Sequence, residues 1–308
     1  MDRLACLRAG IEKHHEVLEI GAYFNPIAPR CEGYRVTTVD VFDTDVLRQK
    51  AAADPSLGPS AVGRIEQVDL IGSACDLADL TVARYGADKR FDWIVSSHNF
   101  EHLPDPIRFL RQCAAVLNPH GTLRMAIPDK RYCFDHYRQV SDVSEWLQAF
   151  HERRMKPTVY QMFRVLAHCS TARDRRHWVP TRQTLDVYRS WFGPDGHPPD
   201  AYLDTHCWAF TPESFELLLH DVQAFGLVPL KIGRISEPRG HEFFVDLCPA
   251  VANQPFSESE YFSRRESLLR RSLAPAPKRL RLSRKIIREA ARMGRQVAAL
   301  GSRPSRLA

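Results

Sequence analysis

The stretch FDWIVSSHNFEHLPDPIRFLRQCAAVLNPHGTLRMAIPDKR, residues 91–131, has the pattern of a strand, a helix and a second strand. FDWIVSS and GTLRMAIP (121–128) are apolar enough to fill buried parallel strands. Between them, Asp105 suits a helix N-cap and Pro106 the first helical position. The apolar residues at helical spacing are Ile107, Leu110, Ala114 and Leu117. Asn118-Pro119 is predicted to end this helix.

Apolar runs of strand length recur on both sides of this segment. They cover residues 16–21, 35–41 and 65–70 before it, and 228–235 and 241–248 after it. Strands that alternate with helical segments are typical of a doubly wound sheet. We therefore predict an α/β fold with a doubly wound, mostly parallel seven-stranded sheet.

Ligands of such a sheet bind outside the carboxyl ends of its strands. The first strand ends at Gly21, but Tyr23 and Phe24 stand where a dinucleotide loop has further glycines. This argues against NAD and FAD, and there is no G-K-[ST] motif for a nucleoside triphosphate. S-adenosylmethionine, which has no phosphate, fits better. Asp40 ends the second strand at a spacing that places an acid on ribose hydroxyls.

His98 and Glu101-His102 follow the order H-x-x-E-H, which is also a zinc-peptidase signature. That signature needs one continuous helix, whereas this stretch abuts a strand and contains Pro104 and Pro106. We interpret it as a strand-end loop and assign no metal ligands. A zinc metallohydrolase is kept as an alternative.

VLEIGAYFNP (17–26), VTTVDVFD (36–43) and the segment 91–131 together carry a family resemblance. The chain resembles class I, Rossmann-like S-adenosylmethionine-dependent methyltransferases, particularly the methyltransferase type 11 group. The resemblance implies a Rossmann-like methyltransferase fold with S-adenosylmethionine as cofactor. The IPDKRY continuation is similar to members linked to glycan or surface-polysaccharide modification, which implies O-methylation of a sugar, glycan or related small-molecule hydroxyl.

The resemblance also implies positions for the cofactor. They are Glu19, Gly21, Asp40, Ser73, Ala74, Ser97 and His98. At Ser73 relatives usually carry an Asp against the adenine ring, so the acid is missing here. Because the first motif also lacks two glycines, a catalytically silent binding module is a second alternative.

Methyl transfer to a hydroxyl needs an aligned nucleophile and a base that takes its proton. His102, one turn beyond the end of the fourth strand, is the first candidate for that base. Asp129, at the end of the fifth strand, is the second. Lys130 and Arg131 are candidates for binding an anionic acceptor such as a sugar phosphate.

The chain divides into four predicted parts. Residues 1–129 and 207–250 form the methyltransferase domain, with the cofactor site in the first part. Residues 130–206 form a helical insertion without a clear strand, expected to act as an acceptor lid. Residues 251–308 form a basic, helical C-terminal extension.

The extension carries the excess positive charge of the chain. From residue 256 to residue 308 there are fourteen Lys or Arg against four Glu. Residues 264–306 are therefore candidates for contact with an anionic membrane surface or a protein partner. No nucleic-acid-binding module is recognised. The sequence has no run that could span a bilayer and no signal-peptide pattern, which predicts a cytoplasmic, at most membrane-peripheral, location.

Overall fold

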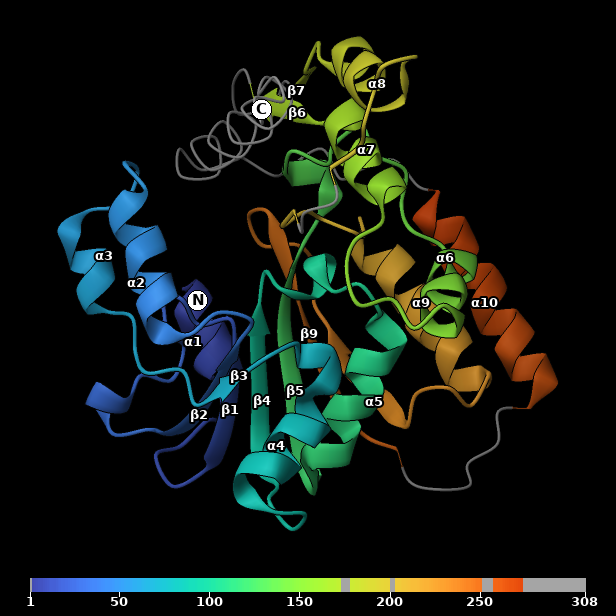
Figure 1. Ribbon diagram of the computed structural model, residues 1–308. Helices are drawn as coiled ribbons and strands as arrows, with labels where there is room; N and C mark the ends of the chain where they lie inside the picture. Colours follow the sequence, from blue (N-terminus) through green and yellow to red (C-terminus); the bar gives the residue numbers. More distant parts are fainter. Residues whose placement is uncertain (1, 173–177, 200–202, 251–256, 274–308) are drawn as a thin grey trace.

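The computed structural model describes residues 2–172, 178–199, 203–250 and 257–273, and its centre is a seven-stranded sheet (Figure 1). The strand order is β3-β2-β1-β4-β5-β9-β8. The strands are β1 (Glu16–Ile20), β2 (Arg35–Asp40), β3 (Leu70–Ile71), β4 (Phe91–Ser97), β5 (Leu117–Pro128), β8 (Leu230–Ile235) and β9 (Glu242–Pro249). The first five are parallel, whereas β9 runs antiparallel to both β5 and β8. The predicted mostly parallel seven-stranded sheet is confirmed.

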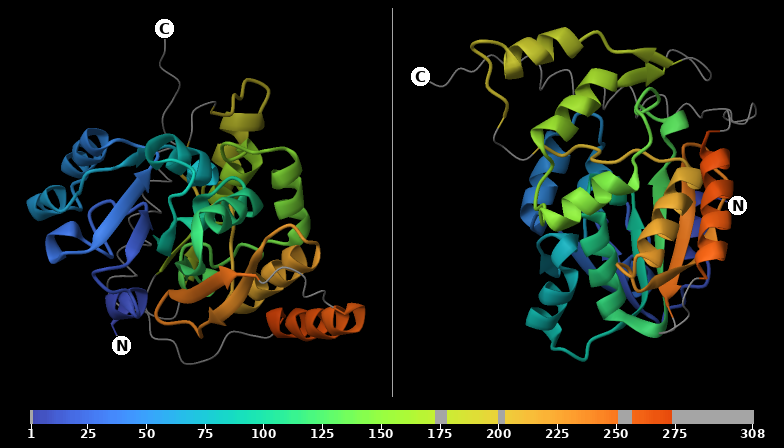
Figure 2. Two further views of the ribbon diagram at one scale, coloured as in Figure 1. Left: turned by 90° about the horizontal axis from the view of Figure 1, so that it is seen from below. Right: turned by 90° about the vertical axis from the view of Figure 1, so that its right-hand side faces the viewer.

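Helices cover both faces of the sheet (Figures 1 and 2). The described helices are α1 (Arg3–Arg8), α2 (Thr44–Ala53), α3 (Pro59–Gly63), α4 (Leu77–Tyr85), α5 (Pro106–Val116), α6 (Val143–His151), α7 (Val159–His168), α8 (Thr184–Phe192), α9 (Pro212–Ala224) and α10 (Glu258–Ser272). Successive strand residues point to opposite faces. Val17 and Val95 therefore pack in one cluster with Leu7 of α1, while Leu18 and Ile94 join the larger core beneath α5 and α9.

Two predicted element boundaries were wrong. The third strand was expected over 65–70, but β3 contains only Leu70 and Ile71. The carboxylate of Asp69 accepts a hydrogen bond of 2.8 Å from the Thr38 amide. In a longer β3, a backbone carbonyl of that strand would have accepted this hydrogen bond. The predicted helix of 105–117 ends at Val116, and β5 begins directly at Leu117.

Most of the insertion lies beyond the carboxyl ends of β4 and β5, with α7 and α8 farthest from the sheet, whereas α6 packs against α5 and α9 (Figures 1 and 2). It contains two antiparallel strands, β6 (Ser170–Ala172) and β7 (Trp178–Pro180), so the prediction of no strand was wrong. Strands of three residues are too short to show an alternating pattern. The insertion starts and ends at the same place, because Asp129 and Phe210 form a β-bridge.

The described start of the C-terminal extension is helix α10, which packs along α9 (Figure 1). Leu268 is fully buried in this contact, and Arg265 forms a 3.0 Å ion pair with Asp221 of α9. The rest of the extension, residues 274–308, lies outside the described residues. Among the residues that the structure describes, no helix is long and apolar enough to cross a membrane.

Leu268→Ala should weaken the docking of α10. Removing a fully buried leucine side chain costs about 2–5 kcal/mol, so the free energy of unfolding in urea should fall by an amount of this order. Leu269→Ala is the matched control, because Leu269 is 38% exposed. Equal effects of the two variants would mean that α10 does not pack through Leu268.

Candidate active site

The loop after β1 is held by a buried carboxyl group. Glu19 is 1% exposed, and its two oxygens accept hydrogen bonds from the amides of Ile27 (2.6 Å) and Ala28 (2.9 Å). Burial raises the pKa of Glu19 to about 7. Gly21 has a φ of 64°, a conformation that glycine adopts at little cost. Glu19 therefore shapes the loop that begins at Gly21.

Asp40 stands at the end of β2, half-buried, where the ribose acid was predicted. One carboxylate oxygen accepts a 3.0 Å hydrogen bond from the Phe42 amide. A pocket beside it is lined by residues that include Ala22, Tyr23 and Glu66. Burial raises the pKa of Asp40, and the charge of Asp204 acts in the same direction. The contact of Asp40 with ribose hydroxyls stays a prediction.

Ser73 and Ala74 follow β3, as the sequence predicted for the adenine side of the site. The hydroxyl of Ser73 accepts a 3.1 Å hydrogen bond from the Cys75 amide and caps a short 3-10 helix. Ala74 is 6% exposed. The Ser73 side chain thus orders its own loop, and its role toward adenine stays a prediction.

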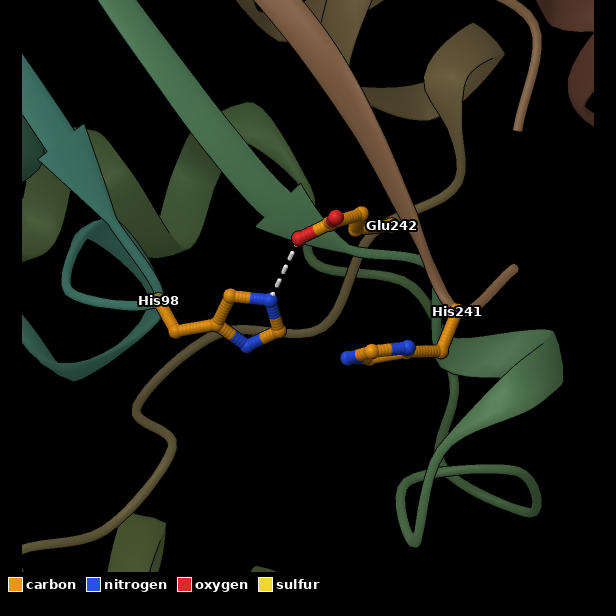
Figure 3. A group of neighbouring side chains, drawn as sticks. All are labelled: His98, His241 and Glu242. Atoms are coloured by element: carbon orange, nitrogen blue, oxygen red, sulfur yellow. Dashed lines mark hydrogen bonds and ion pairs between the residues drawn. The ribbon is translucent and has the colours of Figure 1, made fainter. Parts of the chain in front are cut away.

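His98 leaves the end of β4 in a left-handed conformation, with a φ of 51°. Its Nε2 lies 2.8 Å from the carboxylate of Glu242, and His241 lies beside it (Figure 3). Arg3 bonds both Glu242 and the hydroxyl of Ser97. Burial opposes ionisation of Glu242, but His98 and Arg3 outweigh it and lower the pKa of Glu242 to about 2. Ser97 and His98 are thus anchored by the N-terminal helix and by β9.

Asn99 is a further candidate site residue that sequence reasoning missed. The Nδ2 atom of its amide is buried without a hydrogen-bond partner in the described structure. Its Oδ1 faces the backbone of Gly21, because a Cβ added there would lie 3.8 Å away. Only its place at a strand end, between His98 and Glu101, could have pointed to it.

His102 lies on the short 3-10 helix Phe100–His102 and points toward the insertion. Its Nδ1 lies 2.8 Å from Asp204, and its ring packs edge-on against His206 at 4.6 Å. Burial opposes its charged form, but Asp204, Glu101 and Asp135 together raise the pKa of His102 to about 9. The role of His102 as the base that takes the acceptor's proton stays a prediction.

Asp204 and His206 are two further residues that sequence reasoning missed. His206 is buried, and its Nδ1 lies 2.5 Å from Asp135, which Arg138 bonds on its other side. The signal in the sequence was the number of histidines in the insertion. A single sequence does not show that His206 returns to the loop of His102 from 104 residues away.

Asp129 is fully buried at the end of β5, and both of its oxygens accept hydrogen bonds from Arg131. The ammonium group of Lys130 donates a 2.8 Å hydrogen bond to the His136 carbonyl, and burial lowers the pKa of Lys130. Asp129 therefore orders this loop in the structure. All three side chains already have protein partners, and their roles toward the acceptor stay predictions.

A family model described as a methyltransferase domain matches residues 2–228, which is about three quarters of the chain. The chain belongs to this methyltransferase family. The prediction of a class I, S-adenosylmethionine-dependent methyltransferase is confirmed, whereas the predicted link to glycan modification is not tested by this match. Among curated proteins, none matches the methyltransferase.

Solved structures of other methyltransferases resemble this methyltransferase in part. The CcbJ methyltransferase from Streptomyces caelestis is 14% identical, with 80% of this chain and 88% of that chain covered and a TM-score of 0.42. A SAM-dependent methyltransferase from Methanosarcina mazei is 16% identical, with coverage of 82% and 100% and a TM-score of 0.42. The glycopeptide N-methyltransferase MtfA, complexed with S-adenosylmethionine, is 14% identical, with coverage of 80% and 92% and a TM-score of 0.37.

The buried Glu19 should make the stability of the methyltransferase depend on pH. Its pKa is about 7 in the folded chain against an ordinary value of 4.5, so the folded state binds more protons between these values. The contribution of Glu19 to the free energy of unfolding is therefore complete below its ordinary value. It falls by up to about 3 kcal/mol as the pH rises through the folded pKa.

Urea denaturation across this range should show a flatter pH profile for Glu19→Gln than for the unchanged methyltransferase. Glu12→Gln is the control, because Glu12 is 69% exposed and should leave the profile as it is. Identical profiles for all three proteins would show that Glu19 titrates at its ordinary value.

Proposed function

We propose that this methyltransferase moves the methyl group of S-adenosylmethionine to a hydroxyl of a sugar, a glycan or a related small molecule. The observation that carries the proposal is the composition of the site. The side chains gathered beyond β4, chiefly Glu101, His102, Asp204 and His206, are imidazoles and carboxylates, which suit neutral hydroxyl groups.

The cofactor is proposed to lie across the carboxyl ends of β1, β2 and β4. Gly21 offers the backbone approach, and Asp40 offers a carboxylate for the ribose hydroxyls. Oδ1 of Asn99 faces Gly21, and its Nδ2 has no hydrogen-bond partner in the described structure, so this amide suits the amino-acid end of S-adenosylmethionine. Glu19 acts through the loop that it holds, and Ala74 packs at the adenine side.

The acceptor is proposed to bind between these strand ends and the insertion. The cationic groups of Lys130 and Arg131 bond other parts of the protein, which makes a neutral acceptor a better match than a sugar phosphate. Tyr160 and Tyr188, on α7 and α8, are 71% and 51% exposed. Aromatic rings with a hydroxyl edge suit a carbohydrate, which has both apolar and hydroxyl faces. His102 is proposed to contact the acceptor hydroxyl and to take its proton as the methyl group is transferred.

Contact with an anionic membrane surface or a protein partner is proposed only for the part of the extension beyond α10. Arg264, Arg265 and Arg271 on α10 pair with Glu216 or Asp221 of α9. Their charges are therefore engaged within the fold.

Asp40→Ala should weaken binding of S-adenosylmethionine by about 10- to 100-fold, because hydrogen bonds to a charged group contribute about 1.5–3 kcal/mol. Calorimetry with S-adenosylmethionine, its demethylated product and NAD measures this. Asp45→Ala, which removes an exposed carboxylate from the neighbouring helix α2, should bind like the unchanged protein. Binding of NAD alone would overturn the assignment of the cofactor.

His102→Ala should lower turnover by at least about 100-fold and leave the affinity for S-adenosylmethionine within a few-fold, because His102 faces the insertion. Turnover is measured as the release of the demethylated cofactor in the presence of mixed monosaccharide and glycan acceptors. His168→Ala, on the exposed side of α7, serves as control. Unchanged turnover in His102→Ala would remove His102 from the acceptor site.

A further inference from the structure

Glu101 is fully buried, and neither of its carboxylate oxygens has a hydrogen-bond partner in the described structure. Taking a carboxylate out of water costs several kcal/mol unless a partner compensates its charge. A native protein therefore rarely leaves such a group unpaired. The position of Glu101 calls for a cationic partner.

Three imidazole nitrogens surround this carboxylate. Oε1 of Glu101 lies 3.8 Å from Nδ1 of His98, 3.8 Å from Nε2 of His102 and 3.8 Å from Nε2 of His206. A direct charge-assisted hydrogen bond would be about 2.7–2.9 Å long. Two ligands of one tetrahedral zinc ion lie about 3.4 Å apart. The 3.8 Å distances from Oε1 to the imidazole nitrogens are thus closer to the separation of two ligands on one metal ion than to the length of a hydrogen bond.

We propose that Glu101, His102 and His206 bind a divalent transition-metal ion. The ligand atoms of these three residues lie within 4.8 Å of one another. Imidazole ligands suit zinc, copper, iron and nickel, whereas calcium, magnesium and manganese prefer oxygen ligands. Two histidines and one carboxylate leave coordination positions open for water or another oxygen ligand.

The surroundings of the two histidines support this assignment. Metal-binding histidines usually hold a carboxylate with their second nitrogen, which fixes the ring and its tautomer. His102 has Asp204 at 2.8 Å from Nδ1, and His206 has Asp135 at 2.5 Å from Nδ1. In both rings Nε2 is the nitrogen that faces Glu101.

His98 completes the same arrangement on another side of Glu101. Its Nε2 is held by Glu242 at 2.8 Å, while Nδ1 points away from Glu242 (Figure 3) and lies 3.8 Å from Glu101. Glu242 is also bonded by Arg3, so we assign it to orienting His98. The H-x-x-E-H stretch is thus proposed as a metal site in a strand-end loop, completed by a histidine from the insertion.

An oxygen of the acceptor would suit an open position on this ion, which would make a hydroxyl more acidic. This role rests on the proposed methyl transfer. Binding of the metal does not depend on it, so the test uses neither S-adenosylmethionine nor an acceptor. A failure to bind metal and a failure to transfer methyl groups are therefore separate results.

The test uses the full-length, untagged chain, stripped with a chelator and titrated with Co²⁺. We expect one Co²⁺ per chain, with the visible absorption of nitrogen and oxygen coordination, and displacement by one Zn²⁺. Absence of stoichiometric binding would overturn the proposal. So would a strong thiolate charge-transfer band, because it would place the ion on a cysteine.

Variants then locate the site. Glu101→Gln and His206→Ala should each weaken binding by at least about 100-fold. Asp204→Asn, which removes the carboxylate that holds Nδ1 of His102, should weaken binding by about 10-fold. His168→Ala removes an exposed histidine of the insertion and should bind Co²⁺ like the unchanged chain. Wild-type affinity in both Glu101→Gln and His206→Ala would overturn the proposal. Circular dichroism checks that each variant folds. If Glu101→Gln or His206→Ala does not fold, the test rests on Asp204→Asn, and an unchanged affinity of that variant for Co²⁺ would contradict the assignment.

Discussion

The structure depends on the parallel pairing of β4 with both β1 and β5. This pairing aligns the strand directions, so the segments that follow Ile20, Ser97 and Pro128 emerge at the same edge of the sheet. Most of the candidate site comes from these loops, from the ends of β2 and β3, or from the insertion that leaves this edge. Arg3 of α1 and Glu242 of β9 hold the loop of His98 from outside. The apolar side chains on both faces of the strands fix the register that makes the loops meet.

Local signals in the sequence were enough to predict most of the sheet. The runs 16–21, 91–97 and 241–248 correspond closely to β1, β4 and β9, because strongly apolar strands leave few alternatives. The third strand was too long in the prediction because the Asp69 side chain competes for the Thr38 amide. Such competition depends on a contact across 31 residues, which no local pattern encodes.

The candidate site likewise has residues that local sequence could locate and residues whose surroundings depend on distant contacts. Gly21 and Asp40 could be located from the sequence because each stands at the end of a strand. The environments of His102 and Asp129 could not, since they are set by distant residues and by burial. Asp204 reaches His102 from the insertion, and Arg131 occupies both oxygens of Asp129. The ionisation state of these groups therefore follows from tertiary contacts and not from residue type.

The β-bridge between Asp129 and Phe210 means that the chain leaves the sheet and returns to it at almost one point. The amide of Lys130 strengthens this closure with a 2.8 Å hydrogen bond to the Phe210 carbonyl. Because the two ends of the insertion are tied together, its length and shape can change in evolution without moving β5 or the strands beside it. Related chains can thus exchange the segment that covers the strand ends while the sheet that presents Gly21 and Asp40 stays the same.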